Sequence, residues 1–297
     1  MTEDKIDINA AAGTAIGPTV MVAMEQNFPA AQRVIHDDLA LKVLPASYQF
    51  TVKVMRTPFL RDWMVTSTEQ RLKGGWSGII CRKRYIDERV EEAVTDGSID
   101  AIVNLGAGFD TRLYRLPALA NVPAWEADQP ANIEAKKAAL KKALGQVPAN
   151  VTLVPINFME EDIGAVLAAH GYDIGSRTFF IWEAVSQYLT ETAVRRTFDF
   201  FAQAGAGSQL VFTYILKDFI EGKNYYVLEK TYKQLVVKSH VWHYGFAPQE
   251  MVNFLGEYGW HLVEDLGYDD LNERYMKPTG RDLPSMAIER MVYAEKS

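Results

Sequence analysis

The chain has 297 residues, of which 48% are hydrophobic and 23% are charged, a composition ordinary for a globular protein. Its formal net charge of −7 at pH 7 argues against a general nucleic-acid binder, which needs a basic surface. The single cysteine, Cys81, excludes an internal disulfide and a zinc site built on several thiolates.

The N-terminus and the apolar segments bear on location. Residues Met1 to Asp7 lack the basic stretch and apolar run of a signal peptide. The apolar stretch Gln209–Leu216 is too short to span a bilayer. We therefore expect a cytoplasmic protein with neither a membrane nor a nucleic acid as its partner.

The first hundred residues read as helical. Ala40–Leu44 ends at Pro45, and Tyr48–Val65 carries apolar residues at helical spacing. Tyr85–Val94 is clearly amphipathic and ends before Asp96-Gly97. These segments predict a helical N-terminal cap over residues 1–98.

Short apolar runs then alternate with helical segments. The predicted strands are Ile99–Leu105, Val122–Ala127, Val151–Ile156, Thr178–Trp182 and Gln209–Ile215. The predicted helices between them are Asn132–Leu144, Ile163–His170 and Glu191–Ala204. Strands alternating with helices at this pace predict βαβ units and a parallel sheet, so 99–216 is the expected ligand-binding core.

The alternation of predicted strands and helices is interrupted after the fifth strand. Residues 217–245 are rich in tyrosine, lysine and phenylalanine, and we interpret them as a helical insertion that covers a pocket. Residues 246–297 complete the core with a helix at Pro248–Tyr258 and strands near Trp260–Leu266 and Ala287–Tyr293. No crossover helix is evident between these last strands, which predicts an antiparallel hairpin within one domain of 297 residues.

A glycine loop follows the first strand. Gly106-Ala107-Gly108 lets the backbone turn sharply and approach a ligand. Parallel sheets bind ligands at the carboxyl ends of their strands. Alone, the short glycine pattern is also typical of a plain strand-to-helix turn.

Polar residues end the neighbouring strands. Asp128 follows the second strand, where a carboxylate can accept both hydroxyl protons of a ribose. Asn157 follows the third strand and Glu183 the fourth. The alternative for Asp128 is a cap of the helix that begins near Pro130.

The loop favours one kind of nucleoside ligand. A dinucleotide fingerprint requires glycine or alanine at Thr111, and Asp110 would repel a pyrophosphate. S-Adenosylmethionine, with a sulfonium and an amine, tolerates such a carboxylate. The sequence thus favours methyl transfer over hydride transfer, and a dinucleotide-dependent oxidoreductase is the rival.

Longer motifs resemble the leucine carboxyl methyltransferase family of S-adenosylmethionine-dependent enzymes. The matching segments are Gly13-Thr-Ala15, Arg82-Lys-Arg84-Tyr-Ile-Asp87, Val103-Asn-Leu-Gly-Ala-Gly-Phe-Asp-Thr-Arg112 with Arg115-Leu116, Glu126-Ala-Asp128, Trp182-Glu-Ala-Val-Ser-Gln-Tyr-Leu-Thr190, His243-Tyr-Gly-Phe246 and Phe254-Leu-Gly-Glu-Tyr-Gly-Trp260. The resemblance covers nearly the whole chain and is strongest to the bacterial branch that O-methylates polyketides and other small molecules. It implies a doubly wound, Rossmann-like α/β fold of class I methyltransferases, with a mostly parallel sheet of seven strands.

The resemblance also implies roles for particular residues. Arg82 is expected to bind the methionine carboxylate, with Arg84 and Arg89 as competitors, and a surface ion pair is the alternative for each arginine. Asp128 is expected to hold the ribose and Glu183 to approach the methionine amine. Asn157 stands where the family often has an acidic residue near the adenine. The expected cofactor-binding set is Arg82, Gly106, Ala107, Gly108, Asp128, Gln129, Asn157, Phe158 and Glu183.

The acceptor decides whether a base is needed. A carboxylate is ionised at pH 7 and needs none, whereas a phenol or alcohol needs a base near its hydroxyl. The candidates for that chemistry are His240 and His243, with Tyr188 and Tyr214 as orienting donors. The alternative for the two histidines is packing, and no metal site is expected from them.

We therefore expect an S-adenosylmethionine-dependent O-methyltransferase that acts on a small, polyketide-like acceptor. A methyltransferase of protein C-terminal carboxylates and a cofactor-binding protein without catalysis remain open.

Overall fold

The computed structural model describes residues 16–297, so the Gly13–Ala15 match lies outside the described residues. Seven strands form one sheet in the order β3-β2-β1-β4-β5-β7-β6. The strands are β1 (Ala101–Leu105), β2 (Ala124–Asp128), β3 (Val151–Pro155), β4 (Thr178–Trp182), β5 (Gln209–Ile215), β6 (Trp260–Gly267) and β7 (Glu289–Lys296). Each predicted strand is present; β4 and β5 have the predicted bounds, and the other strands have one or both ends shifted by one to three residues.

The first five strands are parallel, and β7 runs antiparallel to both of its neighbours, β5 and β6. The mostly parallel sheet and the antiparallel last pair are thus confirmed. The connection between β6 and β7 is not a tight hairpin, because it contains α14 (Tyr268–Leu271) and the helical turns Asn272–Met276 and Lys277–Thr279. These turns pack on α6, a contact that the local sequence pattern does not reveal.

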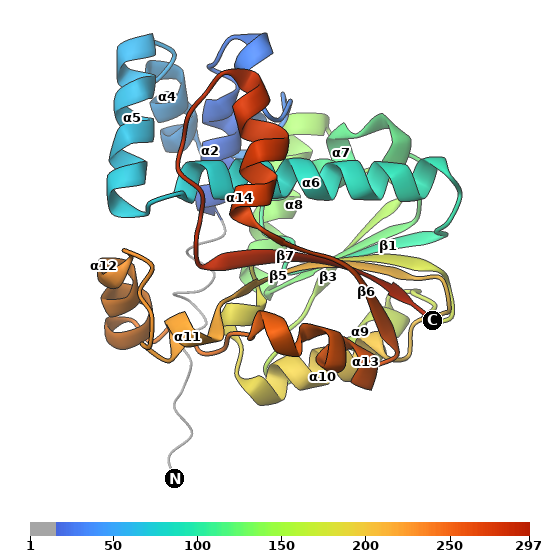
Figure 1. Cartoon of the computed structure of the whole chain (residues 1–297). Coiled ribbons are helices and arrows are strands. Elements are labelled where there is room, and N and C mark those ends of the chain that lie inside the picture. The colour runs from blue at the N-terminus through green and yellow to red at the C-terminus, as the bar shows by residue number, and fades with distance from the viewer. Residues whose placement is uncertain (1–15) are drawn as a thin grey trace.

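Helices cover both faces of the sheet (Figure 1). One face carries α6 (Gly75–Thr95), α7 (Arg112–Arg115), α8 (Pro130–Leu144) and α14, and the other carries α9 (Ile163–Ala169), α10 (Glu191–Phe201) and α13 (Met251–Glu257). The cap adds α2 (Ile16–Glu25), α3 (Ala40–Val43), α4 (Ala46–Val54) and α5 (Pro58–Arg71) beside α6. The helix expected over 48–65 is two helices, because the residue before Pro58 is driven out of helical geometry.

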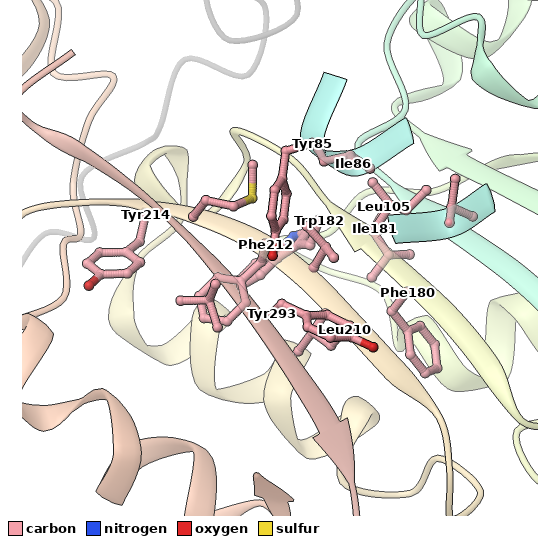
Figure 2. Packing of buried hydrophobic residues seen from close by; sticks show 14 of the residues in the cluster. Tyr85, Ile86, Leu105, Phe180, Ile181, Trp182, Leu210, Phe212, Tyr214 and Tyr293 are labelled. Atoms are coloured by element: carbon pink, nitrogen blue, oxygen red, sulfur yellow. The ribbon is translucent and has the colours of Figure 1, made fainter. Parts of the chain in front are cut away.

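The core lies on both sides of the central strands. All residues of β1, β4 and β5 are buried, which is why these strands are mostly apolar in sequence. Figure 2 shows Trp182 and Phe212 side by side, with ring centroids 6.0 Å apart. Tyr85 and Ile86 reach the sheet from α6. The sheet is therefore a rigid base for the loops at its carboxyl edge.

The insertion after β5 contains less helix than expected. It holds α11 (Lys217–Ile220), α12 (Glu229–Tyr232) and a π-helical segment, Lys233–Lys238, joined by irregular chain. Positive φ angles at Tyr226, Val227 and His240 interrupt regular helix there. The insertion returns to the sheet where Phe246 pairs with Leu216. Within residues 16–297, no helix has the length and apolar character to cross a membrane.

Candidate functional site

A cavity of about 370 Å³ opens at the carboxyl ends of β1, β2, β4 and β5. This volume is within the range of small-molecule sites. The cap contributes Pro18 and Thr19, and the insertion contributes Leu235 and Trp242. Thr19 also donates a hydrogen bond to the carbonyl of Phe109, so the cap touches the glycine loop directly. The cavity thus lies between the sheet, the cap and the insertion.

The glycine loop forms the floor of the cavity. The backbone N–H groups of Gly106 and Ala107 both donate to the carbonyl of Ala127 on β2. Gly106 has φ +73°, and a Cβ added there would lie 2.2 Å from a methyl carbon of Val185. The loop is therefore held between β2 and the segment that follows β4, and only glycine fits at position 106.

Asp128 ties the loop to the start of α8. One carboxylate oxygen accepts from the N–H of Gly108 at 2.6 Å, and the other accepts from the N–H of Gln129 and from Asn132 Nδ2. The N-cap residue of α8 is Gln129, so Asp128 is not the cap in the strict sense. A carboxylate can accept about four hydrogen bonds, so Asp128 keeps capacity for a ligand hydroxyl.

A network of buried charges lies beside the loop. Arg82 contacts Glu183 and Glu289 at 2.8 Å each. Lys83 Nζ lies 3.0 Å from Asp110 and 3.2 Å from Glu183, and Arg112 contacts the same two carboxylates. The network continues away from the cavity to Arg115, Asp87 and Asp37. It connects α6, β4, β7 and the loop after β1.

Proximity of opposite charges keeps this network ionised. Burial alone would raise the pKa of Glu183, but Lys83, Arg82 and Arg112 outweigh it and lower that pKa to about 2. Burial opposes ionisation of Asp110 as well, and the charges of Arg112 and Lys83 hold its pKa well below the ordinary value. Both carboxylates therefore present fixed negative charge to the cavity.

Most of the expected cofactor-binding residues line the cavity. They are Arg82, Gly106, Ala107, Gly108, Asp128, Gln129, Phe158 and Glu183. Asn157 is not among the lining residues. Its side-chain oxygen accepts from the backbone N–H of Met159, which does line the cavity. The competitor Arg89 contacts Glu92 and Glu264 outside the lining. Apart from these placements, the cofactor roles stay predictions.

Of the four residues expected near the acceptor, only Tyr188 lines the cavity. The Tyr214 hydroxyl donates to Asp265 on β6, and Tyr214 is fully buried. His240 is exposed on the insertion. The backbone N–H of His243 donates to the carbonyl of Gln187, but its side chain is not in the lining. The structure therefore does not bring either histidine or Tyr214 to the cavity.

Sequence reasoning missed several lining residues. Lys83 and Glu289 belong to the charge network, where Lys83 contacts Asp110 and Glu183 and Glu289 contacts Arg82, and these contacts join segments far apart in the sequence. Asn104 Nδ2, Gln187 Oε1 and Trp242 Nε1 are buried side-chain atoms of lining residues without a hydrogen-bond partner. An unpaired buried polar group costs about 1–3 kcal/mol, so these atoms mark places where a ligand can bind. Asn104 and Gln187 lie within the motifs Val103–Arg112 and Trp182–Thr190. Membership of these motifs is the signal in the sequence that could have pointed to them.

The family model described as leucine carboxyl methyltransferase matches residues 15–202. The chain belongs to the leucine carboxyl methyltransferase family. Membership confirms the resemblance read from the glycine loop and from Trp182–Thr190. It also confirms S-adenosylmethionine as the cofactor expected of a leucine carboxyl methyltransferase family member.

Relatives of similar sequence are named as S-adenosylmethionine-dependent methyltransferases. A protein of Mycobacterium avium named "Putative S-adenosyl-L-methionine-dependent methyltransferase" is 32% identical over 150 residues, which are 50% of this chain and 49% of that protein. The chain thus spans about half the length of this relative. YktD of Bacillus subtilis, with the same description, is 26% identical over 73% of this chain and 72% of its own length.

Similarity to solved structures confirms the fold expected for this family. A structure from Thermobifida fusca, described as a "putative methyltransferase", superposes with a TM-score of 0.58 at 15% identity, over 80% of this chain and 88% of that chain. A DUF574 family protein from Streptomyces avermitilis gives a TM-score of 0.55 at 12% identity, over 80% and 91%. The doubly wound Rossmann-like arrangement is thus shared at low identity.

Proposed function

We propose that this chain transfers the methyl group of S-adenosylmethionine to an oxygen of a small-molecule acceptor, and that this oxygen belongs to a carboxylate. The observation that carries the cofactor part of the proposal is the charge of the cavity. Among the described lining residues, four carboxylates (Asp110, Asp128, Glu183 and Glu289) face two cations (Arg82 and Lys83).

This charge balance distinguishes the two cofactors that the glycine loop left open. S-Adenosylmethionine carries a sulfonium, an ammonium and one carboxylate, so it is a net cation at neutral pH. A dinucleotide brings a pyrophosphate, which an excess of carboxylates repels. Asp110, two residues after the glycine loop, is one of these carboxylates. Its contacts with Lys83 and Arg112 keep it ionised. The lining therefore favours the sulfonium nucleoside.

The rest of the lining is suited to an apolar acceptor. The apolar side chains of the lining include Leu72, Ile79, Val185, Leu189, Ile215, Leu235 and Met286. The lining carboxylates already have partners, either the cations of the network or, for Asp128, backbone and amide N–H groups. An acceptor that is already anionic requires no proton transfer to any of them.

The reaction is then an in-line displacement. A carboxylate oxygen forms a bond to the methyl carbon as the carbon–sulfur bond breaks, and the electron pair of that bond stays on sulfur. The sulfonium becomes a neutral thioether, the product is a methyl ester, and no proton moves. The chain contributes position, exclusion of water and fixed charge beside the sulfonium. Arg82 and Lys83, the two cations of the lining, are our candidates for the cofactor carboxylate.

Calorimetric titration of the purified protein with S-adenosylmethionine, S-adenosylhomocysteine and NADH tests the cofactor. We expect the two sulfur nucleosides to bind at micromolar concentration and NADH not to bind. Asp128→Ala should weaken nucleoside binding at least tenfold, since it removes the anchor of Gly108. Binding of NADH alone would refute the proposal.

Product chemistry tests the acceptor. Incubation with methyl-labelled cofactor and a panel of carboxylic acids should give labelled methyl esters, which mild alkali cleaves. An alkali-stable labelled product would indicate an ether and an acceptor hydroxyl. Transfer to a peptide C-terminus but to no small acid would favour the protein-methylating alternative.

A further inference from the structure

Two uncharged polar side chains stand in the apolar part of the cavity, and the proposed reaction assigns them no role. Gln187 follows β4 and is only 3% exposed, and its Oε1 has no hydrogen-bond partner. Trp242 belongs to the insertion, and its buried Nε1 also lacks a partner. Both residues line the cavity.

The backbone holds these two residues next to each other. The N–H of His243, the residue after Trp242, donates to the carbonyl of Gln187 at 2.7 Å. The backbone N–H of Trp242 donates to the carbonyl of Leu235. The indole ring of Trp242 packs on the ring of Phe219, with centroids 6.3 Å apart. The indole is therefore fixed in the insertion beside the segment that follows β4.

The segment that carries Gln187 is itself rigid. The N–H of Ala184 donates to Thr213 Oγ1, and Ser186 Oγ donates to the carbonyl of Thr213 on β5. Ala184 has φ +56°, a conformation that residues with a Cβ rarely adopt and that tends to occur at functional sites. Val185, between them, fits against Gly106. Gln187 is thus positioned relative to the glycine loop of the cofactor site.

We propose that Gln187 and Trp242 bind the acceptor carboxylate, with the side-chain amide and the indole N–H donating to its oxygens. An amide group can turn to present either N–H or oxygen, and an indole can only donate. Two neutral donors suit a carboxylate nucleophile, because they orient it without the full ion pair that would weaken its attack. Arg82 and Lys83 are already paired with carboxylates at the cofactor end. This inference rests on the proposed function.

Three naphthalene derivatives of matched shape test the assignment: 2-naphthoate, 2-naphthol and 2-naphthylamine. Their binding to the protein saturated with S-adenosylhomocysteine is measured by calorimetry. We expect 2-naphthoate to bind more tightly than the other two. Trp242→Phe and Gln187→Leu should each weaken its binding about 10- to 100-fold, as expected when a hydrogen bond to a charged group is lost.

Introducing a negative charge gives a sharper test. Gln187→Glu should abolish naphthoate binding by like-charge repulsion and strengthen binding of the protonated amine of a fourth probe, 2-naphthylmethylamine. The matched controls are Trp125→Phe, which removes an indole hydrogen bond to the carbonyl of His170, and Gln203→Leu, at an exposed position just after α10. Both controls should bind naphthoate as the original chain does.

The outcomes separate the two proposals. Failure of S-adenosylhomocysteine to bind would refute the proposed function itself. Tight binding of S-adenosylhomocysteine with naphthoate affinity unchanged in Trp242→Phe and Gln187→Leu would overturn the Gln187–Trp242 assignment alone. The assignment would also be overturned if no naphthalene derivative bound the loaded protein, or if 2-naphthol bound more tightly than 2-naphthoate.

Discussion

Gly106 shows how much of the site depends on single residues. Its left-handed φ and its contact with Val185 are two separate demands on the side chain. Gly97 shares only the first, because it has φ +71° with no atom within 4 Å of an added Cβ. The two glycines therefore separate backbone strain from steric contact.

Gly97→Ala should lower the free energy of unfolding by about 1–2 kcal/mol, the cost of a left-handed residue with a Cβ, and should leave nucleoside affinity unchanged. Gly106→Ala should cost more, because Val185 must also move, and it should weaken binding of S-adenosylhomocysteine at least tenfold. Urea unfolding and calorimetry measure both effects. Equal losses of stability in the two variants would contradict the role of the Val185 contact.

Among the elements, the connection between β6 and β7 does more than join two strands. Arg281 of this connection pairs with Glu25 of α2 at 2.6 Å, and its guanidinium lies over the ring of Phe28. Met286, five residues after Arg281 in the same connection, lines the cavity. The connection therefore links the cap to the wall of the site.

Removing one charge of the Arg281–Glu25 pair should lower the stability of the folded chain. Glu25 is 0% exposed, so Arg281→Met leaves a buried carboxylate without its cation and should lower the free energy of unfolding by about 3–5 kcal/mol. The double variant Arg281→Met with Glu25→Gln should lose at least about 1 kcal/mol less than the sum of the single variants. Urea unfolding of the four proteins measures this coupling, and strictly additive losses would show that the two side chains act independently.

At the scale of the whole molecule, the buried charge network joins parts that are distant in sequence. Glu183 of the segment after β4 meets Arg82 and Lys83 of α6 and Arg112 of α7. These three cations lower the pKa of Glu183 to about 2, from an ordinary value of 4.5. The ionised carboxylate therefore stabilises the folded state.

The pH dependence of stability follows from this shift. The contribution of Glu183 is fully present above about pH 4.5 and is lost as the pH falls towards 2, because the unfolded chain takes up the proton first. Glu183→Gln removes this contribution. The difference in unfolding free energy between the original chain and the variant should be constant from pH 8 to 5 and should shrink below pH 4.5. A difference that shrank between pH 8 and 6 would contradict the assigned pKa.

The sequence by itself predicted the sheet and most of the residues at the glycine-loop end of the cavity. Buried strands such as β1, β4 and β5 leave apolar runs that the sequence shows directly, and a glycine loop with acidic residues at strand ends is a local pattern. Helix ends were less exact, as Tyr48–Val65 shows, since one proline divides it. The longer motifs, such as Val103–Arg112 and Trp182–Thr190, were sufficient to predict the family.

Only the tertiary structure decided which polar side chains meet. His240 and His243 had suitable chemistry, yet the insertion holds them outside the lining. Gln187 and Trp242, 55 positions apart, both line the cavity, and the backbone N–H of His243, next to Trp242, donates to the carbonyl of Gln187. The partners of Arg82 were equally hidden, because Glu183 follows β4 and Glu289 begins β7, and only the folded sheet brings both near α6. Local patterns report the period and burial of one segment, whereas contacts between segments depend on packing energies summed over the whole fold.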